Sequence, residues 1–358
     1  MMVVFMEFQD ISTTWKESKI VKAAIKAIEY HLPEKVLTNV QLAAEFPEWN
    51  MEEIEAKNGI MERHIAGDDE CASDLGVIAA QKLFASQGCY ANEIDYLIFC
   101  TQSPDYFLPT TACLIQDRLQ LPTTAGALDI NMGCSGFIYG LSLAKGLIET
   151  GQSRKVLLIT AETYSKYIQP TDRSVRTIFG DGAAATLIHS VDEVGSEGQS
   201  RIGPFVFGTD GKGSPHLIVK SGGLRNGLFH ENSEHPHLHM KGSEIFAFTL
   251  KRIPLCVNEL LERVNKPIED VDLFVFHQAN QYMVEHLRQK LKIPTSKFCV
   301  ALKHYGNTVS STIPIALKDA LKSERLKSEQ NIMLVGFGVG YSWGATFIRW
   351  TEDTVVSS

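Results

Sequence analysis

The feature of this sequence that most constrains its fold is an internal repeat. EIDYLIFCTQSPDY, which starts at residue 93, resembles DVDLFVFHQANQYM, which starts at residue 270. In the same order, QDRLQLPTT at 116 resembles RQKLKIPTS at 288, and NMGCSG at 131 aligns with HYGNTV at 304. The separations are therefore 177, 172 and 173 residues. Ordered matches at nearly one separation predict that the chain consists of two copies of one structural unit.

Two weaker matches extend the repeat and indicate what the unit is. KVLLITAE at 155 corresponds to NIMLVGFG at 331, and GAAATLI at 182 corresponds to GATFIRW at 344. In each copy, apolar runs typical of buried strands alternate with segments of helical periodicity, such as SDLGVIAAQKLFASQG before IDYLIFC. This alternation predicts an α/β fold with a mostly parallel sheet covered by helices.

The repeat also divides the chain. We expect an N-terminal half over residues 21–195 and a C-terminal half over residues 246–358. Residues 196–245, rich in Gly, Ser, His and Pro, are expected to form the connection and its loops. Residues 1–20 are expected to be an N-terminal extension, because they lack the basic region and cleavage site of a signal peptide. In such duplicated units, pockets open near the carboxyl ends of the strands and where the halves meet.

A cysteine stands where a strand-like run gives way to a helical pattern. LDIN (128–131) ends the apolar run, and helical periodicity begins at Phe137, with Cys134 between Gly133 and Gly136. Because unpaired N–H groups at the start of a helix stabilise a thiolate, we expect the pKa of Cys134 to lie below its reference value of about 8.5. The alternative is a structural cysteine packed like a small apolar residue.

The composition excludes several functional classes. No run of about 18 apolar residues is present, so we expect no membrane span. The seven cysteines form no CxxC pair, which argues against a disulfide framework and a zinc site, and we expect free thiols in a cytoplasmic protein. The net charge of −8 gives no reason to expect nucleic acid as a partner.

The repeat places reactive side chains at equivalent strand ends. Asn307 corresponds to Cys134, and His277 follows the strand-like run LFVF at the position of Cys100. We therefore expect Cys134, His277 and Asn307 to meet at the junction, although each alone is also compatible with a structural role. A thiol, an imidazole and an amide donor suit acyl transfer and stabilisation of an enolate. The run GFGVGYSWG (336–344) can add backbone N–H groups to an oxyanion hole.

A family resemblance is carried by eight segments: NGIMERHIA (58–66), LPTTACLIQ (108–116), GCSGFIYGL (133–141), PTDRSVRTIFGDGAAA (170–185), MKGSEIFAF (240–248), FHQAN (276–280), HYGNTVSSTIP (304–314) and GFGVGYSWGA (336–345). With them the chain, from about residue 20 to about residue 350, resembles the β-ketoacyl-acyl-carrier-protein synthase III family. That resemblance implies a thiolase-like fold, in which two pseudo-duplicated halves form five αβαβα layers, and a homodimer.

The resemblance also implies a two-stage reaction. Cys134 would accept an acyl group from an acyl-CoA or acyl-ACP thioester, with the oxyanion held by the backbone N–H groups of Cys134 and Val339. His277 and Asn307 would then stabilise the enolate formed when malonyl-ACP loses CO2, and the enolate would attack the acyl-cysteine to give a β-ketoacyl-ACP. The reaction implies no metal and no redox cofactor.

Binding residues follow from the same resemblance. The implied positions along the coenzyme A and pantetheine tunnel are Lys57, Arg173, Gly242, Phe246 and Asn280. Leu108 is implied at the acyl pocket across the dimer. Arg288 and Lys290 are expected from charge instead, because residues 281–304 carry an excess of positive charge. This segment is either a solvated helix face or the docking site of an anionic partner, here the acyl carrier protein. Glu53 and Tyr282 depart from the family pattern, in which a tryptophan and an arginine contact coenzyme A.

Other functions remain open from the sequence. The altered coenzyme A contacts suggest a condensing enzyme of a specialised pathway, or an acyltransferase that moves the acyl group from Cys134 to an alcohol or amine. A non-catalytic subunit that binds a carrier protein belongs to a different class. Such a subunit would not need the complete set of Cys134, His277 and Asn307.

Overall fold

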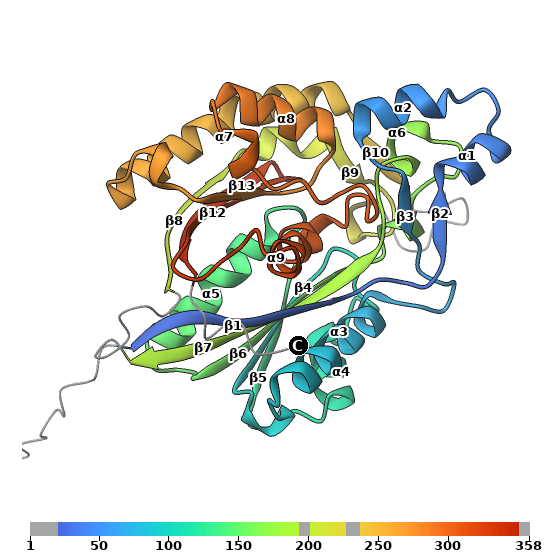
Figure 1. Ribbon diagram of the computed structural model, residues 1–358. Coiled ribbons are helices and arrows are strands. Elements are labelled where there is room, and N and C mark those ends of the chain that lie inside the picture. Colours follow the sequence, from blue (N-terminus) through green and yellow to red (C-terminus); the bar gives the residue numbers. More distant parts are fainter. Residues whose placement is uncertain (1–20, 193–200, 227–236, 351–358) are drawn as a thin grey trace, which may run out of the picture.

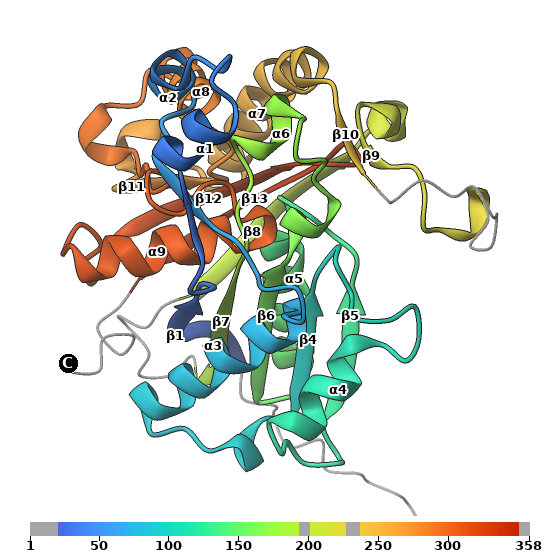
Figure 2. The same cartoon turned by 90° about the vertical axis from the view of Figure 1, so that its right-hand side faces the viewer.

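The computed structural model describes residues 21–192, 201–226 and 237–350, so the expected extension at residues 1–20 lies outside the described residues. Helices and sheets alternate in five layers (Figure 1). A view turned by 90° shows the same order (Figure 2). The layers are α3 (Ala72–Gln87) with α4 (Thr111–Arg118), a five-stranded sheet, α5 (Gly136–Glu149) with α9 (Thr312–Lys322), a four-stranded sheet, and α7 (Gly242–Val264) with α8 (Gln281–Lys290).

The five-stranded sheet belongs to the N-terminal half. Its order is β1-β7-β6-β4-β5, with β4 parallel to β5 and β6, and β7 antiparallel to β6 and β1. Helices cover both faces, so the central strand β6 is one continuous apolar run, buried from Val156 to Glu162. The strands are β1 (Val21–His31), β4 (Tyr96–Cys100), β5 (Gly126–Ile130), β6 (Lys155–Glu162) and β7 (Gly182–Asp192).

The four-stranded sheet repeats this pattern in the C-terminal half. Its order is β11-β12-β13-β8, with β11 parallel to β12, and β13 antiparallel to β12 and β8. These strands thus take the places of β4, β6, β7 and β1. A parallel bridge between Phe274 and Phe298 stands where β4 pairs with β5 in the first half. The strands are β8 (Arg201–Thr209), β11 (Leu273–Phe276), β12 (Asn331–Gly338) and β13 (Ser342–Arg349).

Two features differ from the sequence analysis. The sheets are mixed, not mostly parallel as expected, because three of the strand pairs in the two large sheets are parallel and four are antiparallel. The second difference is one segment. Residues 196–245, expected to be connection and loops, contribute strand β8 to the second sheet and a small sheet of β9 (Leu217–Val219) with β10 (Leu238–Met240). Gly203 and Pro204 interrupt the apolar run of β8, and the pairing of β8 with β13 shifts register there. Proline is tolerated because β8 is an edge strand. The C-terminal half therefore begins with β8, as the N-terminal half begins with β1.

The two central helices bring the halves together. α5 contacts β1 and β6 of the first sheet and β12 and β13 of the second, and α9 contacts β1, β7 and β11. Their starts are neighbours, because a Cβ built on Gly136 would lie 3.6 Å from Cβ of Ser310. Within the described ranges, no helix has both the length and the apolar character needed to cross a membrane.

Shorter elements complete the described chain. β2 (Val36–Thr38) pairs with β3 (Glu62–His64), next to the helices α1 (Asn39–Glu45), α2 (Met51–Asn58) and α6 (Arg173–Arg176). The described residues also form the 3₁₀ helices η1 (Ala91–Glu93), η2 (Tyr164–Tyr167), η3 (Gly211–His216), η4 (Leu224–Asn226), η5 (Ile268–Asp270), η6 (Thr295–Lys297) and η7 (Val309–Ser311).

Candidate active site

Cys134 lies in the turn between β5 and α5, where the sequence pattern had indicated a strand-to-helix junction. The residue is buried, with 5% of its surface exposed. The end of β12 packs directly on it, because a Cβ built on Gly338 would lie 2.8 Å from Cβ of Cys134 and 2.9 Å from its Sγ. No side chain fits at residue 338 without moving the thiol, so glycine allows the close approach of the two backbones.

The pKa of Cys134 is shifted upwards, whereas its place before a helix had predicted a downward shift. Burial and then the nearby charge of Glu162 raise the pKa of the Cys134 thiol to about 12. Backbone N–H groups of Cys134 and Val339 bond to the sulfur and oppose this rise. The resting nucleophile is therefore a thiol, and a base must accept its proton during attack.

His277 follows β11 and lines the same pocket as Cys134. Burial lowers the pKa of its imidazole to about 3, so the ring is neutral at neutral pH. Nδ1 lies 2.7 Å from Oγ1 of Thr312, and this hydroxyl also lies 3.0 Å from the carbonyl oxygen of Val309. Because Nδ1 has a protein partner, Nε2 is the ring nitrogen left to act in the pocket.

Asn307 also lines this pocket and is 4% exposed. Its Oδ1 accepts the backbone N–H of Val309 at 2.9 Å, which fixes the orientation of the amide. Its Nδ2 lies 3.4 Å from the carbonyl oxygen of Ala279. With the amide oxygen used by the backbone, the NH₂ group is what Asn307 offers to a ligand, and an N–H donor suits a carbonyl or enolate oxygen.

A buried carboxylate that the sequence analysis missed lies at the junction of the two halves. Glu162 is the last residue of β6 and has no exposed surface. It accepts hydrogen bonds from Oγ of Ser310 at 2.9 Å, Oγ of Ser103 at 3.1 Å and the N–H of Gln102 at 3.0 Å. Burial raises the pKa of Glu162 to about 8. A glutamate that ends the apolar run KVLLITA was the signal that could have identified it.

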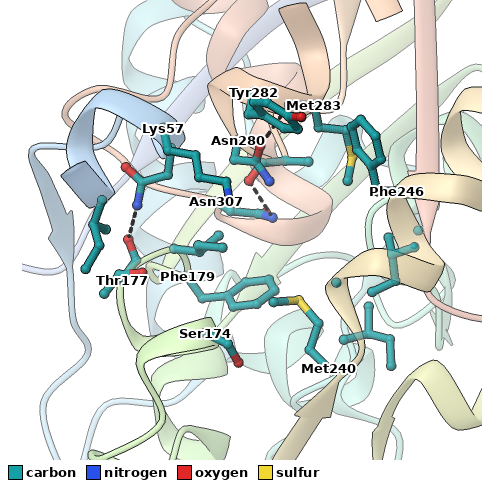
Figure 3. Close-up of a pocket in the computed structure, with 18 of the residues that line it drawn as sticks. Lys57, Ser174, Thr177, Phe179, Met240, Phe246, Asn280, Tyr282, Met283 and Asn307 are labelled. Carbon is teal, nitrogen blue, oxygen red and sulfur yellow. Dashed lines mark hydrogen bonds between the residues drawn. The ribbon is translucent and has the colours of Figure 1, made fainter. Parts of the chain in front are cut away.

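Cys134, His277 and Asn307 open into one pocket of about 670 Å³. The five expected tunnel residues line the same pocket, which is large enough for an extended small-molecule arm. Figure 3 shows Phe179, Met240, Phe246 and Met283 around this cavity. The tunnel residues are Lys57, Arg173, Gly242, Phe246 and Asn280.

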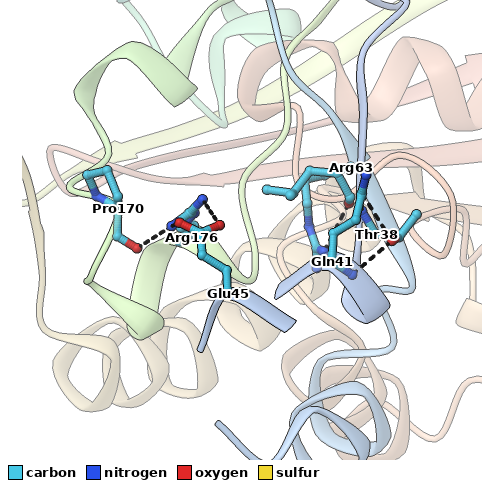
Figure 4. Close-up of polar contacts among 7 residues, drawn as sticks. Thr38, Gln41, Glu45, Arg63, Pro170 and Arg176 are labelled. Atoms are coloured by element: carbon cyan, nitrogen blue, oxygen red, sulfur yellow. Dashed lines mark hydrogen bonds and ion pairs between the residues drawn. The ribbon is translucent and has the colours of Figure 1, made fainter. Parts of the chain in front are cut away.

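Two arginines hold the wall of the pocket that α6 forms, and Figure 4 shows Arg176 with its partners Glu45 and Pro170. Arg176 donates to both carboxylate oxygens of Glu45, at 2.9 and 2.7 Å, and to the carbonyl oxygen of Pro170 at 2.7 Å. Arg63, which is fully buried, donates to the carbonyl oxygen of Thr177 at 2.8 Å. These bonds fix the last residue of α6 and the residue after it, and they tie the helix to Pro170 in the segment before its start. Arg173, the first residue of α6, lines the pocket.

The mouth of the pocket has an aromatic surface. The Tyr282 ring lies 5.3 Å from the ring of Phe246 and 4.1 Å from that of His286, measured between centroids. Nζ of Lys57 lies 5.6 Å from the Tyr282 centroid. Glu53, the other departure from the family pattern, also lines the pocket. Aromatic faces and a neighbouring cation therefore stand where the family pattern has an arginine.

Three of the expected site residues lie outside this pocket. Leu108 is 82% exposed in the loop between β4 and α4. Arg288 is not a free cation, because it donates to both carboxylate oxygens of Glu285 and, at 2.6 Å, to the carbonyl oxygen of Ile293. Lys290 is exposed at the last residue of α8.

Comparison with known proteins gives two matches to family sequence patterns. The pattern described as 3-oxoacyl-[acyl-carrier-protein (ACP)] synthase III matches residues 128–211, which include Cys134. The pattern described as 3-oxoacyl-[acyl-carrier-protein (ACP)] synthase III C terminal matches residues 261–350, which include His277 and Asn307. The two patterns together therefore contain the three side chains that meet in the pocket.

Whole-chain comparisons agree with these matches. The β-ketoacyl-[acyl-carrier-protein] synthase III of Caldanaerobacter subterraneus subsp. tengcongensis is 37% identical over 335 residues, which cover 93% of this chain and 99% of the relative. A crystal structure of a 3-oxoacyl-(acyl-carrier-protein) synthase III is 50% identical with a TM-score of 0.88, and 92% of this chain and 100% of that chain are covered. The 3-oxoacyl-(acyl-carrier protein) synthase from Burkholderia xenovorans LB400 is 35% identical with a TM-score of 0.86, over 94% and 96% of the two chains. The chain therefore belongs to the β-ketoacyl-[acyl-carrier-protein] synthase III family.

Proposed function

We propose that this protein is a decarboxylating β-ketoacyl-[acyl-carrier-protein] synthase, which loads an acyl group on Cys134 and extends it with two carbons from malonyl-ACP. The observation that carries the proposal is that Cys134, His277 and Asn307 open into one pocket with largely apolar walls. The names of the relatives support the same activity. The acyl donor is an acyl-CoA or an acyl-ACP.

The first stage is acyl transfer to the thiol. Sγ of Cys134 attacks the thioester carbonyl, and the developing oxyanion accepts hydrogen bonds from the backbone N–H groups of Cys134 and Val339. When the Thr312 hydroxyl donates to the carbonyl of Val309, it accepts Nδ1–H of His277, so Nε2 carries the lone pair. Nε2 can then take the thiol proton and give it to the departing thiol. The products are the acyl-cysteine and a free thiol.

The second stage is condensation. The thioester carbonyl of malonyl-ACP accepts hydrogen bonds from Nδ2 of Asn307 and from Nε2–H of His277. The second bond requires the other tautomer of the neutral ring, in which Nδ1 has released its proton to solvent, Nε2 has taken one up, and the Thr312 hydroxyl donates to Nδ1. Breaking the bond to the carboxylate releases CO2 and leaves the electron pair on the enolate. The enolate carbon attacks the acyl carbonyl, and Cys134 leaves as the thiolate, which takes up one proton from solvent to restore the resting thiol. Loss of CO2 drives the condensation. The reaction has no net change of oxidation state, so it needs no redox cofactor, and its steps require no metal.

The decisive experiment separates the two stages. Intact-protein mass spectrometry after incubation with acyl-CoA and acyl-ACP donors should show an acyl adduct that is absent from Cys134→Ala. N307A should still load the acyl group but release CO2 from malonyl-ACP at least about 100-fold more slowly. Absence of any adduct on the wild-type protein would refute the loading stage, and equal CO2 release by N307A and wild type would refute the role of Asn307.

The same assays address the other functions. Transfer of the acyl group to an alcohol or amine would not depend on malonyl-ACP, and a carrier-binding subunit would form no adduct on Cys134. No observation in the pocket or in the comparisons favours either function. All seven cysteines carry free thiols, which supports a cytoplasmic location.

Two partner surfaces belong to the proposal. Leu108, with exposed Tyr106 and Phe107, forms an apolar loop that suits insertion into the acyl pocket of a second subunit. L108D should therefore shift the sedimentation coefficient from dimer to monomer. Lys290 suits contact with an acidic carrier protein because it is exposed, whereas Arg288 is paired with Glu285. K290E should weaken carrier-protein binding and reduce the dependence of binding on salt.

A further inference from the structure

Two buried serines connect the cysteine turn to the loop that carries Val339. Oγ of Ser342 lies 2.7 Å from the carbonyl oxygen of Val339 and 2.7 Å from Oγ of Ser135. Ser135 has no exposed surface and Ser342 is 4% exposed. A carbonyl oxygen only accepts, so the Ser342 hydroxyl donates to Val339 and accepts from the Ser135 hydroxyl. The hydrogen bonds thus run in one direction, from Ser135 through Ser342 to Val339.

The Ser135 hydroxyl is not used for a more common purpose. Ser135 is the N-cap residue of α5, and a serine at this position usually accepts a backbone N–H of the first helical turn. Its side chain makes no capping bond here. Its hydrogen-bond partner, Ser342, lies 207 residues away, in the other half of the chain. The hydroxyl therefore links the two halves in place of capping the helix.

The far side of the same loop is held separately. The backbone of Tyr341 exchanges two hydrogen bonds with Asp210, both 2.9 Å long. The Tyr341 hydroxyl lies 2.7 Å from Nδ1 of His216, and its ring stacks on Phe248 with centroids 4.1 Å apart. Tyr341 is thus fixed to the residue that follows β8. Val339 is instead connected to the cysteine turn, through the hydrogen bond from Ser342 to the Val339 carbonyl and the bond from Ser135 to Ser342.

We propose that Ser342 and Ser135 are positioning residues of the oxyanion hole, which hold the N–H groups of Cys134 and Val339 at one acyl carbonyl. The two donors come from different halves, so their separation depends on contacts between the halves. Ser135 adjoins one donor, and Ser342 bonds the residue that supplies the other. The inference rests on the proposed acylation of Cys134, in which fixed donors gain their effect from needing no reorganisation.

The first test is the rate of acylation by p-nitrophenyl butyrate, an activated ester that needs no carrier protein. S342A should acylate about tenfold more slowly than wild type, as expected for a small displacement near the reacting atoms. S135A should have a smaller effect, and S135A/S342A should equal S342A, because Ser135 acts through Ser342. S342T keeps the donor to Val339 and should restore most of the rate.

The control is S73A, which removes another buried hydroxyl far from the loop. Ser73 is fully buried in α3 and donates to Asp105 at 2.6 Å. S73A should change thermal stability about as much as S342A does, but leave the acylation rate unchanged. If S73A slowed acylation as much as S342A, the effect would belong to general stability and the positioning role would be wrong.

A spectroscopic readout isolates the oxyanion hole. The infrared carbonyl stretch of a ¹³C-labelled butyryl group on Cys134 falls in frequency when hydrogen bonds polarise it, so S342A should raise this frequency and S342T should not. An unchanged frequency in S342A would overturn the inference. This outcome is distinct from failure of the proposed function, which would appear as wild-type protein that accepts p-nitrophenyl butyrate but no acyl thioester.

Discussion

Replacing Gly338 by alanine tests how tightly the fold holds the nucleophile. The new Cβ would lie 2.8 Å from Cβ and 2.9 Å from Sγ of Cys134. Ordinary carbon contacts are about 3.5–4.0 Å, so the two groups must separate by about 0.6–1.2 Å. The cysteine turn has little room to retreat along β12, because a Cβ on Gly336 would lie 2.8 Å from Cα of Ser135 and 3.0 Å from the carbonyl oxygen of Cys134.

The magnitude of the effect follows from this displacement. Overpacking of a close-packed interior usually costs about 1–3 kcal/mol, so the free energy of unfolding of G338A should fall by that amount. A shift of about 1 Å in a reacting group can slow a reaction about 100-fold. We therefore expect G338A to fold, but to load Cys134 about 100-fold more slowly than wild type.

The assay compares two glycine-to-alanine variants. Loading is followed by intact-protein mass spectrometry, and stability by urea denaturation. Gly146 lies in α5 with no atom within 4 Å of a built Cβ, so G146A should load normally and gain up to about 1 kcal/mol of stability from the higher helix propensity of alanine. If G338A loaded Cys134 at the wild-type rate, close packing at residue 338 would not set the position of the thiol, and the reasoning would be refuted.

Three further predictions follow from the site. Burial raises the pKa of Glu162 from 4.5 to about 8, so between these pH values the folded protein keeps a proton that the unfolded chain loses. The free energy of unfolding should therefore fall as the pH rises from about 4.5 to 8. Urea denaturation across this range should show a smaller pH dependence for E162Q than for wild type. T312V removes the partner of Nδ1 of His277 and should slow CO2 release from malonyl-ACP about tenfold, with recovery in T312S. R176K breaks the paired bonds to Glu45 that hold α6. Because such an ion pair contributes about 1 kcal/mol, steady-state kinetics should show a KM for the acyl donor that is about fivefold higher than in wild type, with kcat unchanged.

The duplicated topology could be predicted from the sequence because its strands are buried on both faces. YLIFC and LFVF are continuous apolar runs that lie at the same offset from equivalent helices, and β4 and β11 hold the same place in their sheets. β8 was missed because Gly203 and Pro204 break its run, and only its pairing with β13 identifies it as a strand. Local patterns reveal central strands better than edge strands, whose sequences tolerate such breaks.

The site was harder to predict where its properties depend on tertiary packing. The meeting of Cys134, His277 and Asn307 followed from the repeat, because equivalent strand ends meet at the junction. The expected direction of the Cys134 pKa shift is wrong because the start of α5 is only one influence on the thiol, whereas burial and then the charge of Glu162 determine the direction. Thr312, Ser135 and Ser342 carried no signal, since a hydroxyl in a sequence does not reveal which distant carbonyl or imidazole it will contact.

The repeat also explains why one pocket can hold unlike groups on its two sides. Cys134 and Asn307 are equivalent, Cys100 and His277 are equivalent, and β6 and β12 end in Glu162 and Gly338 at matching positions. A symmetric pair of units would present the same group twice. Acyl transfer instead needs a nucleophile on one side of a carbonyl and hydrogen-bond donors on the other. The first half supplies the thiol, and the second supplies the imidazole and the amide. Gly338 completes the asymmetry, because a side chain at this strand end, such as the one its counterpart carries, would occupy the space against which the Cys134 thiol packs.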